Sequence, residues 1–281
     1  MEWFEETLWP NWAQKIRVKE VLYHERTPVQ DLIVFESWSW GRVLALDGVV
    51  QVTTADEFVY HEMMIHPALL AHGRVEELLI VGGGDGGCLR EACRHRSVRR
   101  VTQVEIDAGV IEFCKRYLPT VSAGAYDDPR VRIVIADGAA FVRNCPDRFD
   151  VIVVDSTDPR GPGEVLFTEE FYRACRGLLR PGGIMVTQCG NPAIYPDELV
   201  FTQERQRRAG FADVTYFFAP VPTYIGANMA LGWASDEPAH RRLSLEELQR
   251  RPVPTGLRHY TPEIHLAAFA HPAWMIERVG Y

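Results

Sequence analysis

The chain has 281 residues, of which 47% are hydrophobic and 24% charged, as in globular proteins that bury a large core. Its formal charge of -8 argues against a nucleic-acid surface, because phosphate binding needs clustered Lys and Arg. No segment approaches the ~20 apolar residues of a membrane helix. We therefore expect contact with neither nucleic acid nor membrane, and a large domain beside a small one.

The cysteines and the N-terminus point to a cytoplasmic protein. The six cysteines include no CxxC pair, so neither a zinc site nor a disulfide framework is indicated. The first twelve residues carry three glutamates and no apolar run of the signal-peptide kind.

From residue 22 to about 54 the pattern is one of short β-rich runs broken by turn residues. Runs at 42–46 and 49–53 flank Asp47-Gly48, a pair that supplies the positive φ angles of a tight hairpin turn. We predict that residues 1–70 form a small, mostly β domain.

From residue 76 onward, strands alternate with helices, which is typical of a parallel sheet with crossover helices. Buried strands are predicted at 78–81, 100–106, 130–135, 150–154 and 184–188. Helices are predicted at 87–95 and 168–179, the latter stopped by residues 181–183. The predicted fold class is α/β: the N-terminal β domain, then a Rossmann-like, doubly wound, mostly parallel sheet of the class I methyltransferase type over residues 71–281.

The glycine-rich segment 82–87 follows a predicted strand and precedes a predicted helix. Its glycines would let the backbone approach a ligand closely at the switch point of such a sheet. The pattern also fits dinucleotide enzymes. About twenty residues later, Glu105 ends the next strand, where it can accept hydrogen bonds from ribose hydroxyls. Asp137, followed by Gly138, is placed to read an adenine amino group or is an exposed turn residue.

Asp85 lies inside the glycine turn. A carboxylate there would repel the carboxylate of ordinary S-adenosylmethionine and attract an ammonium group. This favours a decarboxylated donor, although Asp is also a common helix N-cap.

Asp155 and Asp158 follow the predicted strand 150–154, at the strand end where α/β enzymes place ligands. Gln51 and the segment 56–62 add polar and acidic groups from the small domain. Each of these residues has a surface turn or helix face as its alternative.

The chain resembles the polyamine aminopropyltransferases, chiefly the spermidine synthases, through several motifs in order. These motifs lie at residues 56–63, 82–87, 104–107, 137–138, 155–162, 222–224 and 260–265. The resemblance implies transfer of an aminopropyl group from decarboxylated S-adenosylmethionine to putrescine, giving spermidine and methylthioadenosine. It also implies a homodimer or homotetramer built on the N-terminal β domain, and neither a metal nor a cofactor beyond the co-substrate donor.

The resemblance implies a role for each matched residue. Asp155 is the expected catalytic base. The expected donor-binding residues are Gln30, Asp85, Glu105, Asp137, Gly138 and Pro162. The expected amine-binding residues are Gln51, Tyr60, His61, Asp158 and Tyr224.

Residues 225–231 depart from the bacterial pattern, which leaves open the choice among putrescine, cadaverine, agmatine and longer amines. Three other functions stay open. An amine N-methyltransferase is disfavoured by Asp85, and a nicotinamide dehydrogenase by the lack of a catalytic His or Lys constellation. A polyamine-binding protein without turnover would not need the Asp155 base.

Overall fold

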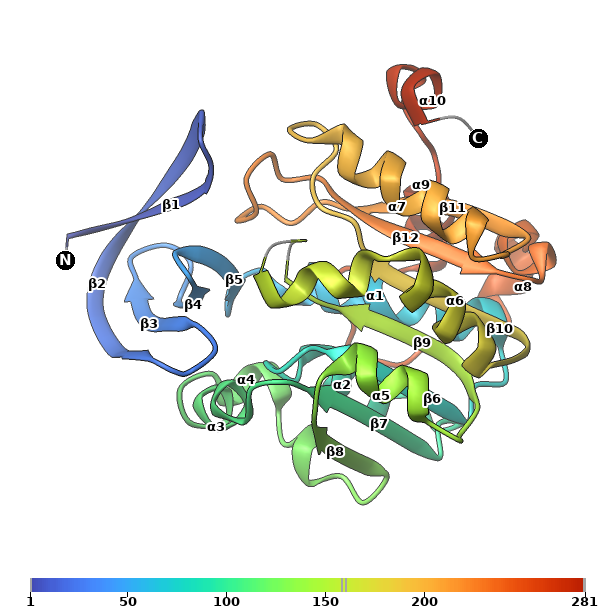
Figure 1. The fold of residues 1–281 in the computed structure, drawn as a ribbon, viewed down its shortest axis with the longest axis horizontal. Coiled ribbons are helices and arrows are strands. Elements are labelled where there is room, and N and C mark those ends of the chain that lie inside the picture. Colours follow the sequence, from blue (N-terminus) through green and yellow to red (C-terminus); the bar gives the residue numbers. More distant parts are fainter. Residues whose placement is uncertain (1, 158, 160, 280–281) are drawn as a thin grey trace.

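The structure is a computed structural model that describes residues 2–157, 159 and 161–279. It contains two sheets, and Figure 1 shows the N-terminal strands as a body beside a larger α/β body. No helix in the described part of the chain is both long and apolar enough to cross a membrane.

The N-terminal sheet is an antiparallel meander of five strands in chain order. They are β1 (Trp3–Trp9), β2 (Trp12–Arg26), β3 (Asp31–Ser37), β4 (Arg42–Leu46) and β5 (Val49–Thr53). The predicted hairpin is confirmed: β4 pairs with β5, and Asp47 and Gly48 have φ angles of 48° and 79°. Strand β1 and most of β2 precede the region, from residue 22 to about 54, in which the sequence indicated strands.

The large sheet has the order β11-β12-β10-β9-β6-β7-β8. Its strands are β6 (Glu77–Gly82), β7 (Arg100–Glu105), β8 (Val131–Ile135), β9 (Phe149–Asp155), β10 (Leu179–Gln188), β11 (Asp213–Ala219) and β12 (Met229–Ser235). The first five are parallel, whereas β12 runs antiparallel to both β10 and β11. The predicted doubly wound, mostly parallel fold is therefore confirmed.

Helices cover both faces of this sheet because side chains along a buried strand alternate between the two faces. Leu78 and Ile80 of β6 pack with α1 (Glu57–His72) and α2 (Gly87–Cys93), whereas Leu79 and Val81 pack with α5 (Gly138–Asn144) and α6 (Glu169–Leu178). The other helices are α3 (Ala108–Tyr117), α4 (Pro119–Ser122), α7 (Pro196–Arg208), α8 (Leu245–Gln249), α9 (Pro262–Ala268) and α10 (Ala273–Val279), with 3-10 turns η1 (Ala125–Asp127), η2 (Gly161–Phe167) and η3 (Pro238–Arg242).

Helix α1 lies in the large body, although the sequence assigned residues up to 70 to the N-terminal domain. The antiparallel sheet ends at Thr53, and α1 packs in one core with β6, β9 and β10. We therefore propose a boundary between residues 53 and 57. One face of the N-terminal sheet packs on α3 and α4, which joins the two bodies.

The predicted stop after α6 differs in detail. The helix ends at Leu178, as expected, but residues 181–183 lie within β10 instead of in a separate turn. The pairing of β10 with β9 changes register between Leu179 and Ile184, so these residues form the irregular start of that strand.

Candidate active site

A cavity of about 370 Å³ lies at the carboxyl ends of the parallel strands, where the strand order reverses between β6 and β9. Most of the predicted site residues line it: Gln30, Gln51, Tyr60, Asp85, Glu105, Asp137, Gly138, Asp155 and Tyr224. Chain segments far apart in sequence thus meet around one space.

The glycine turn lets two carboxylates approach the backbone closely. Gly82 and Gly83 have φ angles of 85° and 67°, and a Cβ atom on Gly83 would lie 2.9 Å from Oδ2 of Asp155. A Cβ atom on Gly84 would lie 2.9 Å from Oε2 of Glu105. Side chains at these positions would displace the acidic residues of the cavity.

Glu105 stands at the end of β7 and is 8% exposed. Burial raises its pKa to about 7, although the backbone N–H groups of Asp107 and Ile106 oppose the rise. Gln30 reaches this region from the N-terminal sheet and donates from Nε2 to Asp107 over 3.2 Å. Asp137 accepts from the Ala140 N–H at 2.6 Å, so it caps α5 while it lines the cavity.

Asp85 lies between the glycine turn and α2. It is not the N-cap of α2, which is Gly86, but its Oδ1 accepts from the Gly87 N–H at 2.6 Å and its side chain lines the cavity. Burial alone would raise the pKa of Asp85, but the charge and hydrogen bond of His61 outweigh it and lower the pKa below its usual value.

Asp155 ends β9 and lies beside the glycine turn. Its Oδ1 accepts from the Tyr60 hydroxyl at 2.8 Å, and its buried Oδ2 has no hydrogen-bond partner among the described residues. Burial, and then the negative charge of Asp85, raise the pKa of Asp155 above its usual range. Such a carboxylate is suited to accept a proton from a ligand in the cavity.

A row of aromatic and polar groups continues from Asp155 toward the N-terminal sheet. The ring of Tyr60 meets that of Tyr224 edge-on, with centroids 5.8 Å apart. The Tyr224 hydroxyl in turn donates to the Gln51 carbonyl oxygen at 2.6 Å. These residues therefore link the end of β9 to β5.

The N-terminal strand β1 contributes Glu6 and Trp9 to the cavity, which sequence reasoning missed. Glu6 is 3% exposed and accepts from the Val50 N–H at 2.9 Å and from Gln14 Nε2 at 2.5 Å. Gln188 and Asn191 also line the cavity without having been predicted. Recognition of β1 as a strand would have directed attention to Glu6.

Two family models cover most of the chain. Residues 57–244 match the spermine/spermidine synthase domain, and residues 2–54 match the spermidine synthase tetramerisation domain. The chain belongs to the spermine/spermidine synthase family. This match confirms both the resemblance seen in the sequence and the prediction that the protein is an aminopropyltransferase.

Relatives in the spermine/spermidine synthase family match the chain over nearly its full length. A polyamine aminopropyltransferase of Pectobacterium carotovorum is 51% identical over 98% of this chain and 96% of the relative, and polyamine aminopropyltransferase 1 of Pseudomonas aeruginosa is 50% identical over 99% and 97%. A spermidine synthase solved in complex with the transition-state analogue AdoDATO has a TM-score of 0.93 at 35% identity, covering 99% of this chain and 94% of that one. The spermidine synthase of Thermotoga maritima has a TM-score of 0.90 at 33% identity, with the same coverage.

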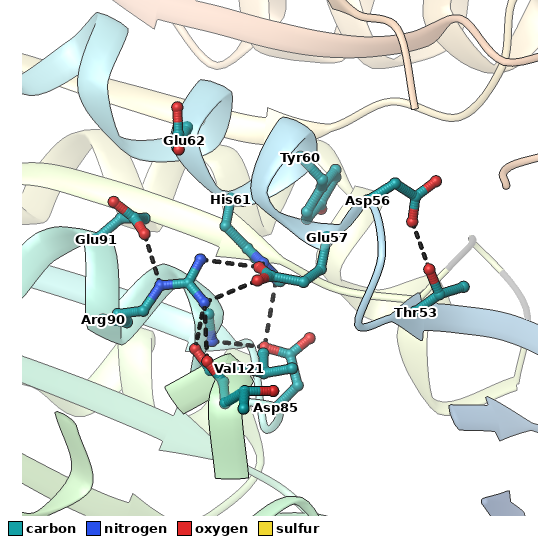
Figure 2. A network of polar contacts seen from close by, with 12 residues as sticks. Thr53, Asp56, Glu57, Tyr60, His61, Glu62, Asp85, Arg90, Glu91 and Val121 are labelled. Atoms are coloured by element: carbon teal, nitrogen blue, oxygen red, sulfur yellow. Dashed lines mark hydrogen bonds and ion pairs between the residues drawn. The ribbon is translucent and has the colours of Figure 1, made fainter. Parts of the chain in front are cut away.

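His61 was expected to line the amine channel, and this role stays a prediction. Its side chain is 2% exposed, is absent from the lining of the cavity and lies between Glu57 and Asp85 (Figure 2). Tyr60 and His61 are adjacent on α1, and adjacent helical residues point about 100° apart. Tyr60 therefore faces Asp155 while His61 faces Glu57 and Asp85.

Two further expected site residues of the synthase family remain predictions. Asp158 lies outside the described residues. Pro162 belongs to η2, but its side chain lies outside the described part of the structure.

The fold also brings Cys88 of α2 next to the cavity. Ligand-type atoms of His61, Cys88 and Asp155 lie within 4.8 Å of one another. A thiol must lose its proton to bind a metal, but burial, followed by the charge of Asp155, raises the pKa of Cys88 well above its usual value. The same proximity shows that the His61 ring lies beside Asp155.

Proposed function

We propose that the protein transfers the aminopropyl group of decarboxylated S-adenosylmethionine to putrescine and yields spermidine and methylthioadenosine. The observation that carries this proposal is the presence of two carboxylates, Asp85 and Asp155, on one cavity at the strand ends. Membership of the spermine/spermidine synthase family supports aminopropyl transfer, and the cavity chemistry supports the choice of reactants.

The donor fits the end of the cavity at β6, β7 and β8. Glu105 and Gln30 are suited to the ribose, and Asp137 to the adenine amino group. Asp85 then faces the ammonium of the aminopropyl chain, where the carboxylate of intact S-adenosylmethionine would be repelled. The donor is a co-substrate, and the reaction as proposed uses neither a metal nor a further cofactor.

Asp155 is proposed as the catalytic base. A primary ammonium has a pKa of about 10.4, like Lys, and its nitrogen has no free lone pair until a proton leaves. The neighbouring sulfonium charge of the donor lowers the pKa of that ammonium, and the buried Asp155 carboxylate accepts the proton. The nitrogen then forms a bond to the carbon beside the sulfur, the carbon–sulfur bond breaks, and the sulfonium becomes a neutral thioether.

The far ammonium of the diamine is proposed to bind near Glu6. The contacts from Asp155 through Tyr60, Tyr224 and Gln51 lead to β5, whose Val50 N–H binds the Glu6 carboxylate. A diamine would therefore have an acid at each end and aromatic rings along its carbon chain. We include Gln51, Tyr224 and Asp158 in this amine site.

Glu6→Gln is expected to raise KM for putrescine about 10- to 100-fold, because a hydrogen bond to a charged group is lost. Steady-state kinetics at saturating donor measure this effect. Glu5→Gln is the matched control, since Glu5 on the same strand pairs with Lys15 at the surface. Equal KM values for the two variants would remove Glu6 from the amine site.

Mass spectrometry of the products tests the proposed function. The protein is incubated with the decarboxylated donor and one of four amines: putrescine, cadaverine, agmatine or spermidine. We expect each amine that is converted to yield methylthioadenosine as the second product, and putrescine to be converted fastest. Methylated amine formed from intact S-adenosylmethionine would instead indicate an N-methyltransferase. Diamine binding without any thioether product would indicate a polyamine-binding protein.

The proposal includes a cytoplasmic homodimer or homotetramer. The cysteines are free thiols, which agrees with a reducing compartment. Trp3, Trp12 and Trp38 are 50%, 52% and 63% exposed on the N-terminal sheet and the turn after β3, which supports assembly through that domain.

A further inference from the structure

A chain of alternating acids and bases leads away from Asp85, which lines the cavity, through residues that do not line it (Figure 2). From Asp85 it passes to His61 at 3.3 Å, and from His61 to Glu57 at 2.7 Å. Arg90 donates two hydrogen bonds, of 2.9 and 2.8 Å, to the Glu57 carboxylate, and its Nε donates to Glu91 at 2.6 Å. The Glu57, His61 and Glu91 side chains are 7%, 2% and 1% exposed, so these contacts are shielded from water.

The contacts favour a cationic His61. Its Nδ1 makes a hydrogen bond of 2.7 Å with Glu57, and its Nε2 lies 3.3 Å from Oδ1 of Asp85, so each ring nitrogen faces a carboxylate and the doubly protonated ring is the form that suits both. Burial alone would lower the pKa of His61, but Asp85 and Glu57 outweigh burial and raise it well above its usual value.

The backbone is shaped to admit this ring. A Cβ atom on Gly87 would lie 2.2 Å from Cε1 and Nδ1 of His61, so the first residue of α2 has to be glycine. Arg90 is fixed on its other side by the Val121 carbonyl oxygen, to which it donates at 2.6 Å. The acids and bases are therefore held in place from α1, α2 and the end of α4.

We propose that Glu57 and Arg90 are positioning residues, which hold His61 as a cation against Asp85 and beside Asp155 and so give the two carboxylates different tasks. This inference rests on the proposed function for the identity of those tasks. With the imidazolium in place, Asp85 stays ionised to bind the donor ammonium, while Asp155 is free to take up a proton. Without it, two neighbouring carboxylates would compete for one proton.

Several titratable groups face His61 from the elements around it. Glu57 and Tyr60 come from α1, Asp85 from the glycine turn, Cys88 from α2 and Asp155 from β9. Arg90 acts on His61 through Glu57. Burial, followed by the negative charge of Asp155, raises the pKa values of the Tyr60 hydroxyl and the Cys88 thiol well above the usual ones, so the Asp85 and Glu57 carboxylates decide the charge of His61.

The first test is an NMR titration of histidine-labelled protein, with the His61 signal assigned from the His61→Gln spectrum. In the native protein the His61 ring is expected to stay protonated between about pH 5.5 and 8. In Glu57→Gln its midpoint should fall toward the ordinary range of histidine. Glu62→Gln is the matched control, because Glu62 on the same helix is equally buried but binds backbone N–H groups of residues 258–260.

The second test is the pH dependence of kcat/KM for putrescine at saturating donor. His61→Gln keeps an N–H donor for Asp85 but removes the charge, so the acid limb is expected to move upward by about one pH unit or more. Methylthioadenosine binding, which involves no ammonium, should remain and reports a folded site. The NMR titration needs no turnover, so failure of the proposed aminopropyl transfer is seen separately, in the native enzyme's products.

An ordinary titration of His61 in the native protein would overturn the inference. So would a midpoint for Glu57→Gln that matches Glu62→Gln, or an acid limb that stays in place in a His61→Gln protein that still binds methylthioadenosine.

Discussion

Asp155→Asn is expected to lower kcat by about 10²- to 10⁴-fold, the usual contribution of a positioned general base. The amide cannot take the proton of the attacking ammonium, yet it has nearly the same shape and can still accept the Tyr60 hydroxyl hydrogen bond at Oδ1. Methylthioadenosine affinity should change little, since its recognition is assigned to Gln30, Glu105 and Asp137. Single-turnover kinetics with bound donor would measure the chemical step directly.

Asp150→Asn is the matched control for this variant. Asp150 is the second residue of the same strand, β9, and accepts from the backbone N–H groups of Glu76 and Glu77 and from the Arg180 guanidinium, at the opposite end from the cavity. Its replacement should reduce stability and leave kcat within a few-fold. Similar kcat losses in both variants would mean that the Asp155 effect is structural.

Asp85→Asn is expected to raise KM for the decarboxylated donor about 10- to 100-fold, because the hydrogen bond between its carboxylate and the donor ammonium loses its charge. Asparagine can still accept from the Gly87 N–H and preserve the turn. The preference for the decarboxylated donor over intact S-adenosylmethionine should shrink by a similar factor. Binding measured by calorimetry for both donors and for methylthioadenosine would separate these effects.

Asp137→Asn serves as the comparison for Asp85. Because Asp137 is assigned to the adenine, its replacement should weaken the decarboxylated donor and methylthioadenosine equally. If Asp85→Asn also weakened both ligands equally, Asp85 would contribute to the shape of the turn and not to donor selection.

Much of the site was predictable because its residues lie at strand ends that local patterns define. The run 150–154 predicted a buried strand, and a residue directly after such a strand must lie at the ligand-binding edge, as Asp155 does. The Asp47-Gly48 turn was predictable for a similar reason, since few residue pairs adopt two positive φ angles.

Other features depend on tertiary contacts that leave little trace in the sequence. Strand β2 is mostly exposed and rich in charged residues, so neither alternation nor an apolar run marked it or its partner β1, and Glu6 went unnoticed. Helix α1 is buried nearly all round, so its sequence has no polar stripe that would mark a solvent-facing side, and nothing local shows that it packs in the large body. The position of His61 depends on how α1 packs against α2, which adjacency to Tyr60 does not reveal.

A competition between two donors tests the central claim most directly, namely that buried carboxylates select cationic reactants. The native enzyme is incubated with putrescine and equal concentrations of decarboxylated and intact S-adenosylmethionine, and the amine products are identified by mass spectrometry. We predict spermidine with no methylated putrescine. Methylated product, or transfer of the carboxyl-bearing side chain at a comparable rate, would contradict the account.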